Sequence, residues 1–320
     1  MKKIGVVTSG GDAPGMNAAI RAVVRPALSS GMEVIGYRRG WDGVVNNRFI
    51  PLTSRSVSNI IQTGGTILQT CRCPEFRNED VLRAAGRHLA AEGVEGLVVI
   101  GGDGSFRAAK DLSEVADVAI AGVPATIDND VYGTDETIGF DTTVNTDVQT
   151  IDKIRDTATA LDRIFIVEVM GRTRGFIAAM VGLTSGAEII LVPEVPVDRE
   201  AIYRAITAHA REGKKSGIIV AAEGIGDTSQ LARDIEANTG LETRLSIVGY
   251  AQRGGSPTAR SRHLACLFGE KAVQLLAEGY RDQVVAIRDG RITTISLKET
   301  TGTAKPLDMS QLRLADALAR

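Results

Sequence analysis

Short apolar runs alternate with amphipathic stretches along almost the whole chain, and this alternation narrowly limits the folds open to it. Strands are expected at residues 4–8, 33–37, 97–101, 118–123, 164–169, 188–192, 217–222 and 245–249. Helical patterns include 16–30, 140–159, 198–212 and 258–278. Strand–helix–strand repetition predicts an α/β fold with mainly parallel sheets and helices on both faces. Residues 283–297 instead predict a small hairpin that turns at Asp289-Gly290.

Composition narrows the classes of function. With 320 residues, 43% of them apolar, the chain can bury a large core, and two domains are expected. A net charge of −2 provides no basic field, so neither nucleic acid nor an anionic membrane is expected as a partner. No apolar run is long enough for a membrane span or a signal peptide, which predicts a cytoplasmic protein.

The cysteines and histidines provide little sign of a metal centre or of nucleophilic catalysis. Cys71, Cys73 and Cys266 make no disulfide framework, which favours a reducing compartment. Cys71 and Cys73 are a bare pair, so ordinary packing is favoured over a metal site. All three histidines lie outside the Gly-rich motifs, which argues against serine-hydrolase or histidine–zinc chemistry.

Two motifs follow neighbouring strand candidates and point to phosphoryl transfer. Residues 101–104 read Gly-Gly-Asp-Gly, and residues 126–130 read Thr-Ile-Asp-Asn-Asp. Glycines let the backbone approach phosphates, and a carboxylate beside them can hold Mg²⁺. Two close carboxylates repel each other, which favours a base able to take a proton from a hydroxyl. A capping turn and an Asx-turn are the structural alternatives for the two motifs.

Further motifs lie at other expected strand ends, where ligands bind in open α/β sheets. The turn Ser9-Gly10-Gly11-Asp12 can cradle phosphate, but it is neither a Walker A motif nor G-x-G-x-x-G, and a structural turn explains it equally well. Arg172 and Arg253 suit a phosphate or a developing negative charge, with a solvated surface role as the alternative. Glu223 can accept hydrogen bonds from sugar hydroxyls.

Together these motifs resemble those of the bacterial 6-phosphofructokinases. The resemblance rests on "SGGDAPGMNAAIR", "GGDGS", "TIDND", "GTDETIGFDT", "VEVMGR", "PEV" and "QRGGSP", which occur in family order, and it is weakest after about residue 280. It implies transfer of the γ-phosphate of ATP to the 1-hydroxyl of fructose 6-phosphate, with Mg²⁺, in a homotetramer. It also implies two Rossmann-like three-layer domains. Residues 1–138 and 251–302 would bind nucleotide, and residues 139–250 and 303–320 would bind the sugar phosphate.

The resemblance assigns roles to single residues. Asp128 would be the base, Thr126 and Asp130 would orient sugar and metal, and Asp103 would be the main acidic residue near Mg²⁺. The nucleotide would be lined by Gly11, Arg72, Cys73, Gly102, Asp103, Gly104 and Ser105, with Trp41 beside the adenine. The sugar phosphate would be held by Met170, Gly171, Arg172, Glu223, Tyr250 and Arg253, and by Arg163 and Arg244 of a neighbouring subunit. Arg72 and Arg172 would also stabilise the transferring phosphoryl group.

The donor and two departures from the family pattern follow from the same comparison of motifs. Pyrophosphate-using relatives carry Asp and Lys where this chain has Gly104 and Ala125, so ATP is favoured. Tyr250 stands where the family has a phosphate-binding His. A phenol carries no positive charge, which predicts a lowered affinity for fructose 6-phosphate or tolerance of another sugar phosphate. Ser261 replaces an acidic residue, which we expect to affect a local ion pair.

An effector site is implied as well. ADP or phosphoenolpyruvate would bind to the cations Arg21, Arg25, Arg155, Lys214 and Lys215, and Glu188 would bind the effector's magnesium. Glu212 and Asn59 stand where the family commonly has Lys and Asp, so allosteric regulation is left open. A purely solvated surface is the alternative for these charges.

Three rival functions are weighed against this one. Another kinase with a Gly-Gly-Asp-Gly loop, such as a diacylglycerol or NAD kinase, would lack the 126–130 motif and the Gln-Arg-Gly-Gly segment. A non-catalytic, effector-binding subunit would be favoured if Asp103 or Asp128 were missing, and both are present. A dinucleotide oxidoreductase is not supported, because no G-x-G-x-x-G occurs.

Overall fold

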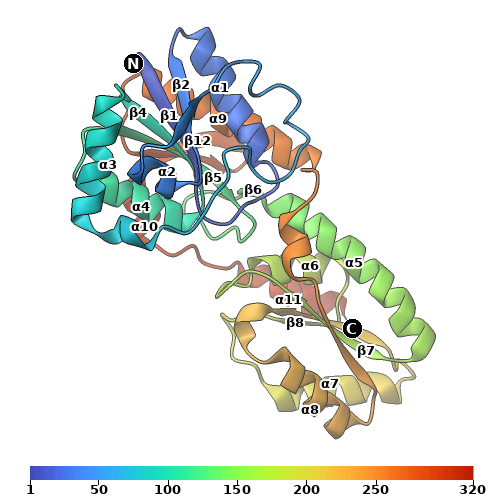
Figure 1. Cartoon of the computed structure of the whole chain (residues 1–320). Coiled ribbons are helices and arrows are strands. Elements are labelled where there is room, and N and C mark those ends of the chain that lie inside the picture. Colours follow the sequence, from blue (N-terminus) through green and yellow to red (C-terminus); the bar gives the residue numbers. More distant parts are fainter. Residues whose placement is uncertain (320) are drawn as a thin grey trace. The chain divides into compact units, whose positions relative to one another are not determined.

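The computed structural model describes residues 1–319, and its strands form two sheets (Figure 1). The strands are β1 (Lys3–Thr8), β2 (Glu33–Tyr37), β3 (Phe49–Pro51), β4 (Gly96–Gly101), β5 (Ala119–Thr126), β6 (Ile138–Gly139), β7 (Ile164–Val169), β8 (Ile189–Leu191), β9 (Gly217–Ala222), β10 (Thr243–Ile247), β11 (Gln283–Arg288) and β12 (Arg291–Ser296). The larger sheet has the order β12-β11-β5-β4-β1-β2-β3, with β6 paired to β5, and only β3 and β12 are antiparallel to their neighbours. The smaller sheet, β10-β7-β9-β8, is parallel throughout.

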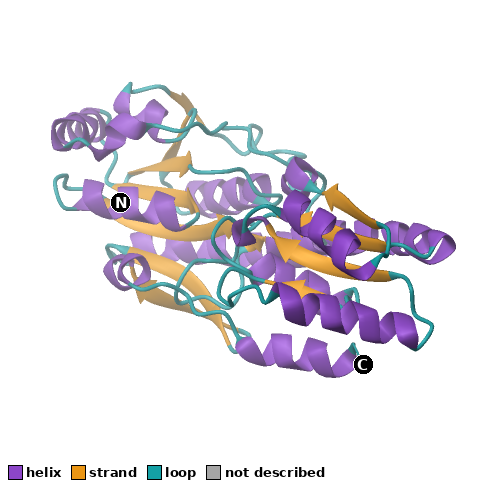
Figure 2. Ribbon diagram, turned by 90° about the horizontal axis from the view of Figure 1, so that it is seen from below, coloured by secondary structure: helices purple, strands orange, loops and turns teal. Residues whose placement is uncertain are grey.

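Helices separate most of the strands in sequence, and Figure 2 shows strands running between layers of helices. The helices are α1 (Met16–Ser29), α2 (Trp41–Val45), α3 (Glu79–Ala91), α4 (Asp103–Ser113), α5 (Phe140–Leu161), α6 (Phe176–Thr184), α7 (Arg199–Arg211), α8 (Thr228–Thr239), α9 (Ala259–Ala277), α10 (Leu297–Gly302) and α11 (Met309–Leu318). Short 3₁₀ turns cover Pro74–Arg77, Glu223–Ile225 and Gly249–Arg253. The predicted α/β class with mainly parallel sheets is confirmed. Within residues 1–319, no helix has the length and apolar character needed to cross a membrane.

The chain separates into two compact units. The first contains Met1–Thr142 and Arg253–Lys305, and the second contains Thr143–Gln252 and the segment that starts at Pro306. Each unit has its own buried apolar cluster. Arg320, the last residue of the smaller domain expected from sequence, lies outside the described residues. Which unit binds which substrate stays a prediction.

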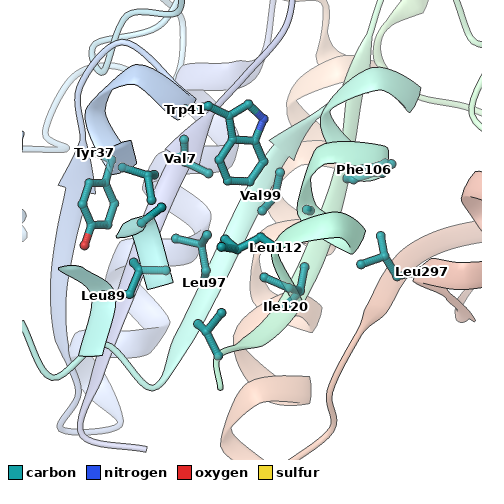
Figure 3. Close-up of a cluster of buried hydrophobic side chains, with 14 of the residues drawn as sticks. Val7, Tyr37, Trp41, Leu89, Leu97, Val99, Phe106, Leu112, Ile120 and Leu297 are labelled. Atoms are coloured by element: carbon teal, nitrogen blue, oxygen red, sulfur yellow. The ribbon is translucent and has the colours of Figure 1, made fainter. Parts of the chain in front are cut away.

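The core of the first unit supports the loops that follow β4 and β5. All six residues of β4 are buried, since helices cover both faces of the strand, and this explains why its sequence is continuously apolar. Figure 3 shows Tyr37, Trp41, Leu97 and Phe106 among the side chains of this core. Burying one such side chain contributes roughly 1.5–3 kcal/mol to the free energy of unfolding. The well-packed core therefore stabilises the positions of the strand ends from which the two loops leave.

The C-terminal hairpin is predicted correctly from local sequence, whereas the bounds of one strand are not. β11 and β12 are joined at Asp289 (φ 50°) and Gly290 (φ 74°), the left-handed pair that a two-residue hairpin turn needs, so the predicted hairpin is confirmed. The hairpin extends the larger sheet, because β11 pairs with β5. The strand expected at 245–249 lies two residues earlier in the sequence, at Thr243–Ile247. β10 ends at Ile247, because Gly249 (φ 59°) begins a 3₁₀ turn.

Asp147 on α5 is expected to make the fold sensitive to alkaline pH. Its side chain is fully buried, and neither carboxylate oxygen has a hydrogen-bond partner among residues 1–319. Burial raises its pKa to about 8. The folded chain therefore binds this proton more tightly than the unfolded chain, whose aspartates have a pKa near 3.9. The free energy of unfolding then falls as pH rises from about 4 towards 8.

We therefore expect Asp147→Asn to raise the melting temperature, and to raise it more at pH 8 than at pH 5. The difference reaches about 1.4 kcal/mol for each pH unit crossed within this window. Asp152→Asn is the matched control, because Asp152 is an exposed carboxylate on the same helix. Calorimetric unfolding at the two pH values measures both variants. Equal shifts for Asp147→Asn at pH 5 and pH 8 would contradict the buried, protonated state.

Candidate active site

The two acidic motifs leave the same edge of the larger sheet from adjacent strands. β4 and β5 are parallel neighbours, with Gly101 opposite Pro124, and each motif begins at the carboxyl end of its strand. A Cβ atom added at Gly102 would lie 3.1 Å from Cβ of Thr126, so the motifs touch. The structure therefore brings Gly102, Asp103 and Thr126 together, as the sequence predicts for ligand-binding loops of such sheets.

Asp103 begins the helix that follows the glycine-rich loop after β4. It is the first residue of α4, where the helix dipole favours negative charge, and its Oδ2 lies 2.9 Å from Nη2 of Arg107. Among the described residues, no three His, Cys, Asp or Glu side chains form a metal cage. Mg²⁺ commonly takes one or two carboxylates and leaves its other positions to water and phosphate. This arrangement therefore fits Mg²⁺ that arrives with a nucleotide.

The loop after β5 fixes Asp128 in a buried position. Asp128 is 3% exposed, and its backbone N–H donates to Oγ1 of Thr126 at 3.2 Å. Thr137 Oγ1 donates to the carbonyl oxygen of Thr126 at 2.7 Å, which ties the two ends of the loop together. Asn129 adopts a left-handed conformation (φ 51°) that turns the chain directly after Asp128. The backbone around the carboxylate is thus fixed by these two hydrogen bonds and by the left-handed residue that follows.

Ser105 offers a hydroxyl beside the glycine-rich segments. Its Oγ is buried and has no hydrogen-bond partner among residues 1–319. A Cβ atom would lie 2.5 Å from this oxygen if added at Gly101, and 3.1 Å from it if added at Gly10. A side chain at Gly101 would collide with this oxygen and with the carbonyl oxygen of Ser9, and one at Gly10 would crowd the hydroxyl. A buried, unsatisfied hydroxyl calls for a partner, and a phosphate oxygen would provide one.

Arg253 lies over the first glycine-rich loop, which sequence reading did not predict. Its Nη1 donates to the carbonyl oxygen of Asp12 at 3.1 Å. A Cβ atom at Gly11 would come within 2.2 Å of the same nitrogen, so a side chain there would have to push the end of the arginine aside. The two partners are 241 residues apart in sequence, and no local pattern reports the contact.

The other residues predicted for the nucleotide lie in the same unit. Arg72 is exposed. Burial, with the nearby carboxylate of Glu75, raises the pKa of Cys73 to about 12, so its thiol is neutral. Trp41 is 5% exposed and stacks on Phe76 with ring centroids 4.5 Å apart. Its ring belongs to the core drawn in Figure 3, which leaves little of it for an adenine.

The second unit gathers its predicted residues at the ends of β7 and β9. Val169 lies opposite Ala222 in these parallel strands, so Met170 and Glu223 follow at the same edge. The backbone N–H of Arg172 donates to Oε1 of Glu223 at 2.7 Å. A Cβ atom at Gly224 would approach the carbonyl oxygen of Arg172 to 2.2 Å. The two backbone segments therefore pass so close to each other that position 224 needs glycine.

Gln252 is a residue of this unit that sequence reading missed. Its Oε1 accepts from the backbone N–H of Met170 at 3.1 Å, and its own carbonyl oxygen accepts from Oγ1 of Thr143 at 2.7 Å. Gly171 has φ 132°, which only glycine adopts readily. Gln252 and Glu223 thus hold the backbone of residues 170–172 from two sides. The signal was present, because Gln252 precedes Arg253 in a motif already singled out.

Two further arginines and a tyrosine lie in the second unit. Nε of Arg163 lies 2.7 Å from Oε2 of Glu242, and Arg244 pairs with the same carboxylate. Glu242 therefore keeps the two guanidinium groups together. Tyr250 is 82% exposed, so its phenol is open to a ligand or a partner chain.

Three of the predicted effector-binding residues meet around one carboxylate of the second unit. Glu188 Oε1 lies 2.7 Å from Nζ of Lys214 and 3.6 Å from Nη1 of Arg155, and its Oε2 accepts from the N–H of Ile218. Burial opposes ionisation of Glu188, but the hydrogen bonds from Lys214 and Ile218 win and lower its pKa. Lys215 is exposed beside this group, and Arg21 and Arg25 lie on α1 of the first unit.

Comparison with known proteins places the chain among close relatives. The family model described as phosphofructokinase matches residues 3–276. The ATP-dependent 6-phosphofructokinase 1 of Clostridium perfringens is 50% identical over 318 residues, which cover 99% of each chain. The ATP-dependent 6-phosphofructokinase 1 of Thermus thermophilus is 52% identical over 321 residues and the full length of both.

A solved structure agrees. A crystal structure of Pichia pastoris phosphofructokinase is similar over 94% of this chain and 35% of its own, at 34% identity and a TM-score of 0.88.

Proposed function

The chain belongs to the phosphofructokinase family and is an ATP-dependent kinase of fructose 6-phosphate in glycolysis, and we propose how its residues share the reaction. The observation that supports this best is the contact between the Gly-Gly-Asp-Gly loop and the loop of Asp128. A phosphate-binding turn and a buried carboxylate at adjacent strand ends are the parts that phosphoryl transfer to an alcohol needs.

In the first unit, Asp128 takes the proton of the sugar 1-hydroxyl as the oxygen attacks the γ-phosphorus of ATP. Thr126 and Asp130 orient the sugar. Asp103 would hold Mg²⁺, which would supply positive charge to the phosphates of the nucleotide. The glycines and the unsatisfied hydroxyl of Ser105 receive phosphate oxygens. Remaining nucleotide contacts come from Gly11, Arg72, Cys73, Gly102 and Gly104, with Arg72 also stabilising the transferring group.

ATP is the donor rather than pyrophosphate. The curated relatives reported above are named ATP-dependent. A Cβ atom at Gly104 would meet no protein atom within 4 Å, so the space above the loop is open to a nucleotide. Ala125 is fully buried within β5 and offers no charge to replace that of a lysine.

In the second unit, the segment 170–172 and Glu223 bind the sugar phosphate. The hydrogen bonds of Glu223 and Gln252 to this segment set its backbone before any ligand arrives, which lowers the ordering cost of binding. Arg172 supplies charge for the phosphate. The expected role of Arg253, which belongs to the first unit, stays a prediction. Arg163 and Arg244 act on the substrate of a neighbouring subunit, so we propose a homotetramer in the cytoplasm with sites shared between chains.

We further propose that ADP or phosphoenolpyruvate acts between subunits, at the cations around Glu188 and at Lys215 of one chain, with Arg21 and Arg25 supplied by a neighbouring subunit. An anionic effector would exchange places with the carboxylate of Glu188 as the partner of Lys214. A magnesium ion carried by the effector would compensate Glu188.

Replacing Tyr250 by histidine is expected to lower the KM for fructose 6-phosphate. A protonated imidazole makes a charge-assisted hydrogen bond to phosphate, roughly twice as strong as that of a phenol, which corresponds to about a fivefold lower KM. Initial rates over a range of sugar phosphate measure the change. Tyr280→His is the control, since Tyr280 is also exposed, at 55%. An unchanged KM would show that Tyr250 does not contact the phosphate.

The assignment as a whole is tested by ADP release. Purified protein is supplied with ATP, Mg²⁺ and fructose 6-phosphate, and a parallel reaction contains pyrophosphate in place of ATP. Saturable, sugar-dependent ADP formation without turnover of pyrophosphate is expected. Turnover with pyrophosphate alone would overturn the donor assignment, and turnover with neither would favour another phosphosugar or a non-catalytic subunit.

A further inference from the structure

The loop that carries Asp128 is anchored at its outer end on the β11–β12 hairpin. It leaves β5 at Thr126 and returns as β6. Thr134 Oγ1 accepts from the N–H of Ile287 at 3.1 Å, and the N–H of Asp135 donates to the carbonyl oxygen of Ile287 at 2.8 Å. Oδ2 of Asp135 accepts from the N–H of Asp289 at 2.8 Å. Asp135 is therefore a fixed point of the loop.

A lysine from a distant part of the chain reaches this fixed point. Nζ of Lys305 donates to the carbonyl oxygen of Asp135 at 3.1 Å. The same oxygen accepts from Nδ2 of Asn129 at 3.1 Å. A carbonyl oxygen has two lone pairs, so Lys305 and Asn129 together satisfy it. Asn129, in its left-handed conformation, directly follows Asp128. One shared acceptor thus separates Lys305 from the turn that sets the proposed base.

The negative charges of the loop also favour the positively charged amine of Lys305 beside it. Four carboxylates lie within nine residues, at positions 128, 130, 135 and 136. Arg260 pairs with Glu136 through two hydrogen bonds of 2.9 and 2.5 Å. Lys305 lies close enough to Asp135, Asp130 and Glu136 for each to favour its charged form. Although burial lowers its pKa to about 8, most of the amine is protonated at neutral pH.

Lys305 is also the last residue of the first unit before the chain passes into the second. Pro306 follows it and restricts its backbone to extended conformations. The backbone that carries the Lys305 side chain is therefore already restricted, and little conformational entropy is lost when the side chain binds the loop.

We propose that Lys305 is a positioning residue for the reaction, because it holds the Asp135 carbonyl shared with Asn129 and so keeps Asp128 in the orientation that accepts the sugar proton. The inference rests on the proposed role of Asp128. It adds a residue 170 positions away from the loop that it supports.

Lys305→Met tests this with a matched rescue. The methionine keeps most of the length and removes the charge and the donor. We expect kcat to fall about 10- to 100-fold, as a displacement of about 1 Å in a catalytic group does, while the KM for ATP stays within about twofold. Lys305→Arg keeps both charge and donor and is expected to recover most of the rate. Lys298→Met is the control, because Lys298 is exposed on α10.

Hydrogen exchange of the ligand-free protein provides a readout that does not depend on turnover. In Lys305→Met, amides of residues 127–137 are expected to exchange faster, with the rest of the chain unchanged. Unaltered exchange, or wild-type kcat despite faster exchange, would overturn the positioning role. So would an equal loss of rate in Lys305→Arg with a melting temperature lowered in both variants. If wild-type protein releases no ADP, the proposed function fails, and faster exchange still reports the anchor.

Discussion

Asp128→Ser is expected to lower kcat by about three orders of magnitude while the protein still binds fructose 6-phosphate. A serine hydroxyl cannot take a proton at neutral pH, and removing a positioned base typically costs 10²–10⁴ in rate. The backbone N–H at this position donates to Thr126 whatever the side chain, so the loop is expected to keep its course. Rapid-quench measurement of ADP, with sugar binding followed separately, distinguishes the chemical step from affinity.

Asp117→Ser serves as the control for this substitution. Asp117 is an exposed carboxylate just before β5, paired only at the surface with Arg281. Its loss is expected to leave kcat within about twofold, because exposed pairs contribute little. A turnover near that of wild type in Asp128→Ser would show that another group takes the proton.

The second large effect is expected at Gly104. Gly104→Asp places a carboxylate where the phosphates of ATP would pass, and a close pair of like charges costs several kcal/mol. We expect kcat/KM for ATP to fall by at least about 10²-fold. The melting temperature is expected to stay the same, since no protein atom lies within 4 Å of the added Cβ. Initial rates over a range of ATP, together with thermal unfolding, provide both readouts.

Gly104→Ala separates size from charge. A methyl group alone is expected to lower kcat/KM for ATP less than the carboxylate does. A kcat/KM that falls from wild type to Ala and further to Asp would identify charge repulsion as the main cause. Gain of turnover with pyrophosphate is not expected in either variant, because Ala125 supplies no cation. A full rate with ATP in Gly104→Asp would place the nucleotide elsewhere.

Much of this architecture was readable from local sequence because local signals determine it. Continuous apolar runs predicted β4 and β5, since strands covered on both faces have no polar side. Asp289-Gly290 predicted its hairpin because few other pairs accept two left-handed residues. The grouping of the 101–104 and 126–130 motifs followed from parallel pairing, which places successive strand ends on one edge.

Contacts between distant segments could not be predicted in the same way. Gln252 reaches Met170 across 82 residues, and Lys305 reaches Asp135 across 170. Neither pair forms a periodic or spaced pattern, because tertiary packing alone brings the partners together. Trp41 is a further example. The resemblance implies a contact with adenine, which stays a prediction, but the sequence did not show that the ring stacks on Phe76 within the core.

The contact between Gly11 and Arg253 couples two positions that lie far apart in the gene. A side chain at position 11 would push the end of the Arg253 side chain aside and so break its hydrogen bond to the carbonyl oxygen of Asp12. A change at either position is therefore felt at the same place in the folded chain, although the two codons are more than seven hundred nucleotides apart.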